Sequence, residues 1–179
     1  MKNETDILRD LSGKFAQADI AYMLTGSFAM NYYAQPRMTR DLDVVVQLTV
    51  QDAERIVRLF DAEYYVAIEA VRTAIMNESS FNLIHLESVI KVDCIVRKKS
   101  AYRQLEFERR QQIEIQDFTI WIASKEDLII SKLHWARDSH SETQLRDVKN
   151  LLATEYDAAY LERWSKDLGL ELLLRECSE

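Results

Sequence analysis

Two aspartates separated by one residue, Asp41 and Asp43, give the clearest chemical signal in this sequence. They lie in the run DLDVVV, which predicts a β-strand because it is apolar and rich in valine. Alternate side chains of a strand point to the same face, so both carboxylates are expected on one face. Two adjacent anions repel each other unless a cation lies between them or one of them takes a proton. The pair therefore predicts a cation site.

A glycine–serine pair, Gly26–Ser27, lies upstream, between the apolar run Ala21–Leu24 and a short helical segment, Ser27–Tyr33. Glycine lets the backbone approach a phosphate closely, serine adds a hydroxyl, and the first turn of a helix offers free N–H groups. The chain has only three glycines and one proline, which gives Gly26 added weight. Together with the carboxylates, this turn predicts Mg²⁺ and a nucleoside triphosphate as ligands.

A third acid, Asp93, lies inside another apolar run, VIKVDCIVR, and shares a strand face with Lys91 and Ile95. Paired metal ions sit roughly 3.5–4 Å apart and usually share a bridging carboxylate. Two carboxylates on one strand and a third on a neighbouring strand meet that demand. Such ions neutralise the phosphates in phosphoryl or nucleotidyl transfer. An alternating acidic strand is also compatible with a solvent-facing sheet edge that binds nothing.

Short strands and helices must position these residues. Apolar periodicity and turn signals predict helices over residues 4–18, 27–33, 49–62, 69–77 and 101–110, and strands over 21–24, 41–48, 81–86, 89–97 and 113–123. Pro36 ends the second helix, because the residue before a proline is disfavoured in helical geometry. The runs 81–86 and 89–97 have the spacing of a hairpin. Residues 63–68 are ambiguous between a short strand and a loop.

From Ser124 the pattern becomes entirely helical. Ser124 with Asp127 three residues later resembles a capping box, and helices are predicted over 128–137, 142–153, 157–167 and 170–176. The sequence thus predicts an α+β core at 1–123, with a small mixed β-sheet flanked by helices. A helical C-terminal segment, 124–179, is predicted to pack on that core.

Composition narrows the functional classes. With 23 basic and 30 acidic residues the net charge is −7, which disfavours non-specific binding of DNA or RNA but permits a local basic cleft. Cys94 and Cys177 have neither metal-ligand nor redox spacing, and they give no disulfide framework. The polar start MKNETDILRD is not a signal peptide, and no apolar run approaches ~18 residues. We therefore expect a cytoplasmic protein with no membrane association.

The motif Gly26–Ser27, then R-x-T-x-D-x-D from Arg37 to Asp43, then a later strand acid resembles the nucleotidyltransferase superfamily of the DNA polymerase beta type. The resemblance is closest to small bacterial members, which include toxin–antitoxin and abortive-infection enzymes and aminoglycoside or lincosamide nucleotidyltransferases. It covers roughly residues 20–153. In the tail, ASKEDLIISKLHWARDSHSETQLRDVKNLL is similar to the helical segment of such proteins, where a lysine and an Arg–Asp pair recur. The matching residues here are Lys132, Arg146 and Asp147.

The resemblance implies a nucleotidyltransferase fold and an enzyme that moves an NMP group from an NTP such as ATP to a hydroxyl acceptor. It implies two Mg²⁺ ions, held by Asp41, Asp43 and Asp93, with Asp93 also activating the acceptor hydroxyl. Gly26 and Ser27 would hold the triphosphate. The candidates for further phosphate contacts are Arg37, Thr39 and Lys132. The acceptor is a small molecule, a protein or an RNA end.

Other interpretations stay open at this point. The chain also fits a catalytically silent nucleotide- or partner-binding module of the same fold, as one component of a toxin–antitoxin pair, or a metal-dependent phosphohydrolase that uses the same acids. A homodimer or an antitoxin complex is possible with either. Individual residues have plain alternatives: Arg37 and Thr39 as caps of the turn after Pro36, Lys132 extended along its helix, and Arg146–Asp147 as an exposed pair.

Overall fold

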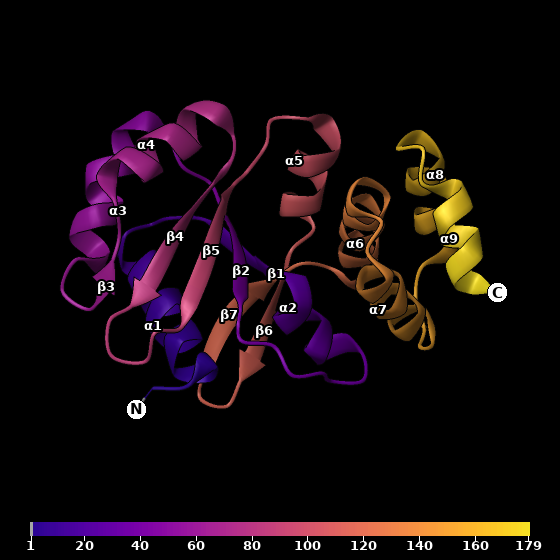
Figure 1. Cartoon of the computed structure of the whole chain (residues 1–179), viewed down its shortest axis with the longest axis horizontal. Helices are drawn as coiled ribbons and strands as arrows, with labels where there is room; N and C mark the ends of the chain where they lie inside the picture. The colour runs from indigo at the N-terminus through magenta and orange to yellow at the C-terminus, as the bar shows by residue number, and fades with distance from the viewer. Residues whose placement is uncertain (1) are drawn as a thin grey trace. The chain divides into compact units, whose positions relative to one another are not determined.

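Seven strands form one mixed sheet in the computed structural model, which describes residues 2–179 (Figure 1). Their order across the sheet is β3-β4-β5-β2-β1-β7-β6. The strands are β1 (Tyr22–Thr25), β2 (Leu42–Val46), β3 (Tyr64–Tyr65), β4 (Ser80–His85), β5 (Lys91–Val96), β6 (Gln111–Ile115) and β7 (Phe118–Ile122). The pairs β2–β5 and β1–β7 are parallel, and the other neighbours are antiparallel. The predicted mixed sheet is confirmed.

Helices alternate with these strands and then continue alone. They are α1 (Glu4–Gln17), α2 (Gly26–Tyr33), the short 3-10 turn η1 (Val50–Asp52), α3 (Ala53–Phe60), α4 (Ile68–Asn77), α5 (Ala101–Glu108), α6 (Lys125–Ser139), α7 (Glu142–Leu152), α8 (Ala158–Asp167) and α9 (Glu171–Ser178). Each predicted helix is present within a few residues of its expected bounds. The ambiguous stretch 63–68 contains the two-residue strand β3 and the first residue of α4.

One predicted element is wrong. The run 113–123, expected to be a single strand, is part of the antiparallel hairpin β6–β7, with Ile115 paired to Phe118. Its two-residue turn is Gln116–Asp117, and Gln116 takes the left-handed conformation at φ 56°. Left-handed turn positions usually hold glycine or asparagine. A glutamine there gave no turn signal, and apolar alternation continues on both sides of it.

Three helices, α1, α3 and α4, cover one face of the sheet (Figure 1). Buried side chains of β2 and β5 alternate toward this face, among them Leu42, Val44 and Val46. Phe15 of α1 packs against Tyr22 and Phe60, with ring centroids 5.1 and 5.6 Å apart. In Figure 1, α3 and α4 lie beside β3 and β4. This apolar layer fixes which side chains of each strand point to the opposite face.

The opposite face is partly covered by α5. There Phe107 packs with Met23 and Ala123, and Val45 packs against this cluster. Beyond it, the same face carries the polar side chains Asp43, Lys91 and Asp93 on β2 and β5.

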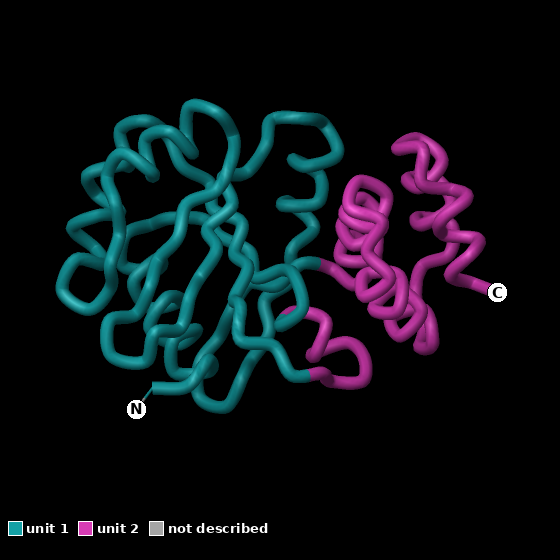
Figure 2. The backbone as a smooth tube through the Cα atoms, viewed as in Figure 1, with its two compact units in different colours: residues 1–28, 38–123 teal, residues 29–37, 124–179 magenta. Residues whose placement is uncertain are grey.

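The chain divides into two compact units (Figure 2). Unit 1 consists of residues 1–28 and 38–123 and contains the sheet, whereas unit 2 consists of 29–37 and 124–179. Within unit 2, buried apolar residues of α6 and α7 form a helical core. Two polar contacts reinforce it: the Tyr160 hydroxyl donates to Asp127 at 2.6 Å, and Lys125 donates to the carbonyl oxygens of Thr154 and Glu155. No helix among the described residues is long and apolar enough to cross a membrane.

Candidate active site

The strand register aligns four polar side chains across the sheet. Thr25 of β1 pairs with Asp43 of β2, Asp43 with Asp93 of β5, and Asp93 with Asn82 of β4. Directly paired residues on neighbouring strands point to the same face, so the two carboxylates are cross-strand neighbours. Like charges directly opposite each other are destabilising. This row, called the acidic row below, is therefore the candidate binding site.

Gly26 lies against one of these carboxylates. It begins α2 directly after β1, at φ +67°, a conformation that favours glycine. A Cβ at this position would stand only 2.7 Å from Cγ and 2.9 Å from Cβ of Asp43. Both the backbone angle and the missing side chain are therefore required for the close approach of the turn to Asp43. Ser27, the next residue, is half-buried in the first turn of α2.

Lys91 is the cation among these acids. It lies two residues before Asp93 on the same face of β5, and its Nζ forms an ion pair with Asp93 Oδ2 at 2.9 Å. The hydrogen bond to Asp93 raises the pKa of Lys91, and the charges of Asp41 and Asp43 raise it further. The ammonium group therefore interacts electrostatically with all three predicted acids. Asp41 itself is exposed and precedes β2 by one residue.

The residues fit a divalent cation in type and in part in geometry. Carboxylate oxygens are the ligands that Mg²⁺ prefers, and Asp43 and Asp93 lie in register beside a backbone turn that no side chain fills. As the side chains stand, however, no three metal-binding groups among residues 2–179 converge closely enough to hold an ion. The strand register places Asp43 beside Asp93, whereas Asp41 precedes β2 and is not part of this pairing.

The predicted phosphate contacts are divided between the two units. Thr39 belongs to unit 1, whereas Arg37 and Lys132 belong to unit 2. Arg37 donates from Nε and Nη2 to the two carboxylate oxygens of Asp147, each at 3.0 Å. Lys132 Nζ donates to the same carboxylate at 2.7 Å and to Gln144 at 3.1 Å. Side-chain hydrogen bonds within unit 2 therefore hold both cations in place.

This ion triad is largely buried. The side chains of Lys132 and Asp147 are each 4% exposed, and that of Arg37 is 37% exposed. Burial alone would raise the pKa of Asp147, but the hydrogen bonds from Arg37 and Lys132 outweigh it and lower that pKa. The interpretation of Arg146–Asp147 as an exposed pair is wrong for Asp147, although Arg146 is exposed. A phosphate could reach Lys132 only by competing with Asp147.

The turn that carries Arg37 is fixed by a side chain of α2. Asn31 donates from Nδ2 to the carbonyl oxygen of Arg37 and accepts from its backbone N–H, both at 3.0 Å. Asn150 of α7 donates to the carbonyl oxygen of Gln35 at 2.9 Å. These bonds hold the chain on both sides of Pro36. The guanidinium of Arg37 therefore extends from an ordered turn.

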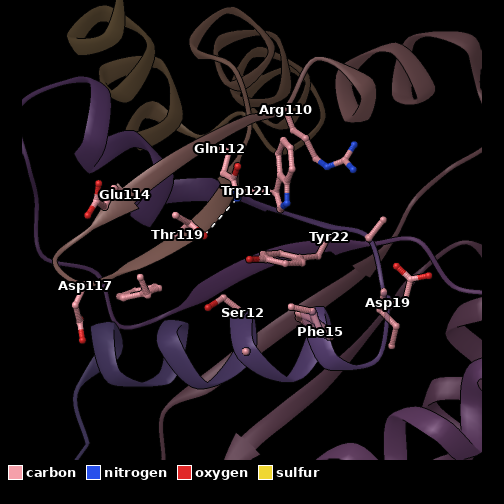
Figure 3. Close-up of a pocket in the computed structure, with 15 residues that line it drawn as sticks. Ser12, Phe15, Asp19, Tyr22, Arg110, Gln112, Glu114, Asp117, Thr119 and Trp121 are labelled. Carbon is pink, nitrogen blue, oxygen red and sulfur yellow. Dashed lines mark hydrogen bonds between the residues drawn. The ribbon is translucent and has the colours of Figure 1, made fainter.

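A hollow of about 620 Å³ lies elsewhere in unit 1, between α1, the start of β1 and the β6–β7 hairpin (Figure 3). Its lining includes the rings of Tyr22 and Trp121. None of the predicted site residues lines it. Asp117, one of the acids that line it, is paired with Arg9 of α1. The acidic row and this hollow are therefore separate features.

Sequence reasoning did not assign Asn82 of the acidic row, or Lys91 beside Asp93, to the site. The signal for Lys91 was available, because a lysine two residues before Asp93 must share its strand face. Asn82 had no comparable signal, since its place beside Asp93 depends on the register of the β4–β5 hairpin.

Replacing Gly26 with alanine is expected to destabilise the protein by about 1–2 kcal/mol from the left-handed backbone angle alone. The added methyl group would also push the Asp43 carboxylate away from its neighbour. Chemical denaturation measures the first effect. Gly13→Ala is the matched control: it lies within α1 with nothing within 4 Å of a new Cβ, and should stabilise by about 0.5–1 kcal/mol. Equal effects from the two substitutions would contradict this account of Gly26.

Comparison with protein families gives one match that covers most of the chain. The family model described as the nucleotidyl transferase AbiEii toxin of a type IV toxin–antitoxin system matches residues 7–168. These residues include the whole acidic row and the buried triad. Comparison with curated proteins gives no match.

Solved structures show the same fold. The lincosamide antibiotic adenylyltransferase LnuA, bound to lincomycin, is 19% identical with a TM-score of 0.54, over 83% of this chain and 96% of that one. An antigenic nucleotidyltransferase-like protein from Paracoccidioides brasiliensis is 15% identical, with a TM-score of 0.58 over 94% and 90%. ANT(2")-Ia, in complex with adenylyl-2"-tobramycin, is 12% identical, with a TM-score of 0.55 over 97% and 95%. At these identities the similarity shows the fold alone.

Proposed function

Because the chain belongs to the AbiEii nucleotidyltransferase toxin family, we propose that it is a Mg²⁺-dependent enzyme that transfers an NMP group from an NTP to a hydroxyl acceptor. The observation that carries this proposal is the in-register pair Asp43–Asp93, with Gly26 packed against Asp43. A fold alone does not define an activity, so the proposal is supported by the chemistry of this site. The family also supports an antitoxin as the cellular partner.

In the proposed site Asp41, Asp43 and Asp93 would hold Mg²⁺. When bound, Mg²⁺ neutralises the triphosphate and the charge that develops on the leaving pyrophosphate. The turn at Gly26 and Ser27 offers backbone N–H groups to the phosphates. The same proposal assigns Arg37, Thr39 and Lys132 to phosphate contacts, with Lys132 first leaving Asp147.

The chain's own part in the reaction is positioning and proton transfer. The acceptor oxygen bonds to the α-phosphorus, and the bond from that phosphorus to the bridging oxygen breaks as pyrophosphate leaves. Asp93 accepts the proton of the attacking hydroxyl, a role open to a carboxylate within hydrogen-bond reach. The electron pair of the broken bond leaves with pyrophosphate, so the step is balanced without another reactant.

The test is transfer of label from each of the four α-³²P-labelled NTPs. The purified protein is incubated with Mg²⁺ and, separately, with tRNA, total protein and a small-molecule extract of bacterial cells. We expect label to appear in one acceptor pool, and chelation of divalent ions with EDTA to abolish it. Nucleotide binding without label in any pool would favour the silent binding module. Release of labelled monophosphate with no modified acceptor would favour the phosphohydrolase.

A further inference from the structure

Lys91 has contacts that the proposed reaction does not explain. It is the cation paired with Asp93, and it interacts electrostatically with Asp41 and Asp43 as well. Its side chain is 40% exposed and that of Asp93 is 25% exposed, so their ion pair lies at the surface. Lysine carries its charge on a flexible four-carbon stem, which lets the ammonium group move without any change in the strand.

The Lys91–Asp93 ion pair and a bound metal ion would both use the carboxylate oxygens of Asp93. Lys91 Nζ contacts Oδ2 of Asp93 at 2.9 Å, on the face of the sheet where Asp43 lies in register. A divalent ion bridging Asp43 and Asp93 would lie beside that ammonium group, and two cations that close repel each other. Exposed ion pairs contribute little to stability, so this pair can open at small cost.

We propose that Lys91 is a tethered counter-cation, which pairs with Asp93 when no divalent ion is bound and is displaced when one binds. This inference rests on the proposed function, because it assumes that Asp43 and Asp93 ligate the metal. Lys91 offsets the repulsion between these neighbouring carboxylates in the metal-free protein. It therefore lowers the apparent affinity for the metal, because the ion must replace a cation that is already present.

The experiment measures Mn²⁺ binding to the full chain in the absence of nucleotide, from the electron paramagnetic resonance signal of free Mn²⁺. Lys91→Met removes the charge and keeps the length of the side chain. We expect this variant to bind Mn²⁺ more than about fivefold more tightly than the wild type, because fivefold is the effect between two unit charges about 4 Å apart in water and Mn²⁺ is divalent. Lys91→Arg keeps the charge and should keep the weaker affinity.

Two further variants separate the possible outcomes. Lys98→Met changes the net charge equally but lies on an exposed residue outside the strand, so its Mn²⁺ affinity should match that of the wild type. Asp43→Ala sets the level of binding outside the site. If the wild type binds more Mn²⁺ than Asp43→Ala but Lys91→Met binds no more tightly, the role of Lys91 is overturned and the metal site stands. If neither exceeds Asp43→Ala, the metal site and this inference both fail.

Discussion

Replacing Asp43 with alanine is expected to lower the rate of NMP transfer by roughly 1000-fold or more. Metal ions supply several kcal/mol of charge stabilisation in such reactions, and each 1.36 kcal/mol corresponds to a factor of ten. Asp43 is central to the proposed site, because it is in register with Asp93 and in contact with Gly26. Its loss removes a metal ligand and leaves the strand β2 intact. The rate of label transfer to the acceptor pool measures the effect.

The control for this prediction is Asp61→Ala. Asp61 is an exposed acid that follows α3, a helix on the other face of the sheet, and its loss changes the net charge equally. We expect Asp61→Ala to retain wild-type activity. Circular dichroism and the unfolding midpoint should show that Asp43→Ala is folded, because removal of the Asp43 carboxylate relieves its repulsion with Asp93. A folded Asp43→Ala variant with undiminished transfer would falsify the proposed metal site.

Replacing Asp147 with alanine is expected to destabilise the protein by about 3–5 kcal/mol, the usual cost of removing one partner from a buried ion pair. The substitution removes the carboxylate that is paired with the ammonium group of Lys132, a side chain that is only 4% exposed. It also removes the two hydrogen bonds, from Nε and Nη2 of Arg37 to the carboxylate, that fix the guanidinium. Chemical denaturation measures the free energy of unfolding. Arg146→Ala, at the exposed neighbouring residue, should change it by less than about 0.5 kcal/mol.

The pH dependence of stability provides a second readout for Asp147. Because its pKa is lowered in the folded protein, the folded state favours the charged carboxylate. The stabilisation from this group is fully present above its unfolded pKa of about 3.9 and is lost as the pH falls through the lower folded value. The wild type should therefore lose more stability below about pH 4 than Asp147→Ala does. Parallel losses in the two proteins would show that Arg37 and Lys132 do not stabilise this charge.

The sheet and the face on which each acid lies could be predicted because both follow from local patterns. Alternation in DLDVVV places Leu42, Val44 and Val46 on the buried face, and the structure confirms this placement. The hairpin of β4 and β5 is likewise confirmed. The same reasoning grouped Asp93 with Lys91, but it did not recognise the lysine as a partner of the acids.

What the sequence alone could not predict depends on contacts between distant residues. The burial of Asp147 depends on Arg37, which lies far away in the sequence and reaches it only in the folded chain. The turn at Gln116 has no local signal, because a left-handed glutamine is selected by the pairing of β6 with β7. The division of predicted phosphate contacts between two units likewise follows from tertiary structure. The predicted domain boundary after residue 123 stays a prediction.

The parallel pairing of β2 with β5 also bears on when the protein can act during its synthesis. Asp43 leaves the ribosome early, but its partner Asp93 lies on β5, which is separated from β2 by the 3-10 turn η1, the helices α3 and α4, and the strands β3 and β4. Non-local strand pairs form only after loop closure has been accomplished, so they form late in folding. A nascent chain that ends before Asp93 thus contains the D-x-D motif without a complete acidic row. The proposed site can therefore be complete only after β5 has been made and has paired with β2.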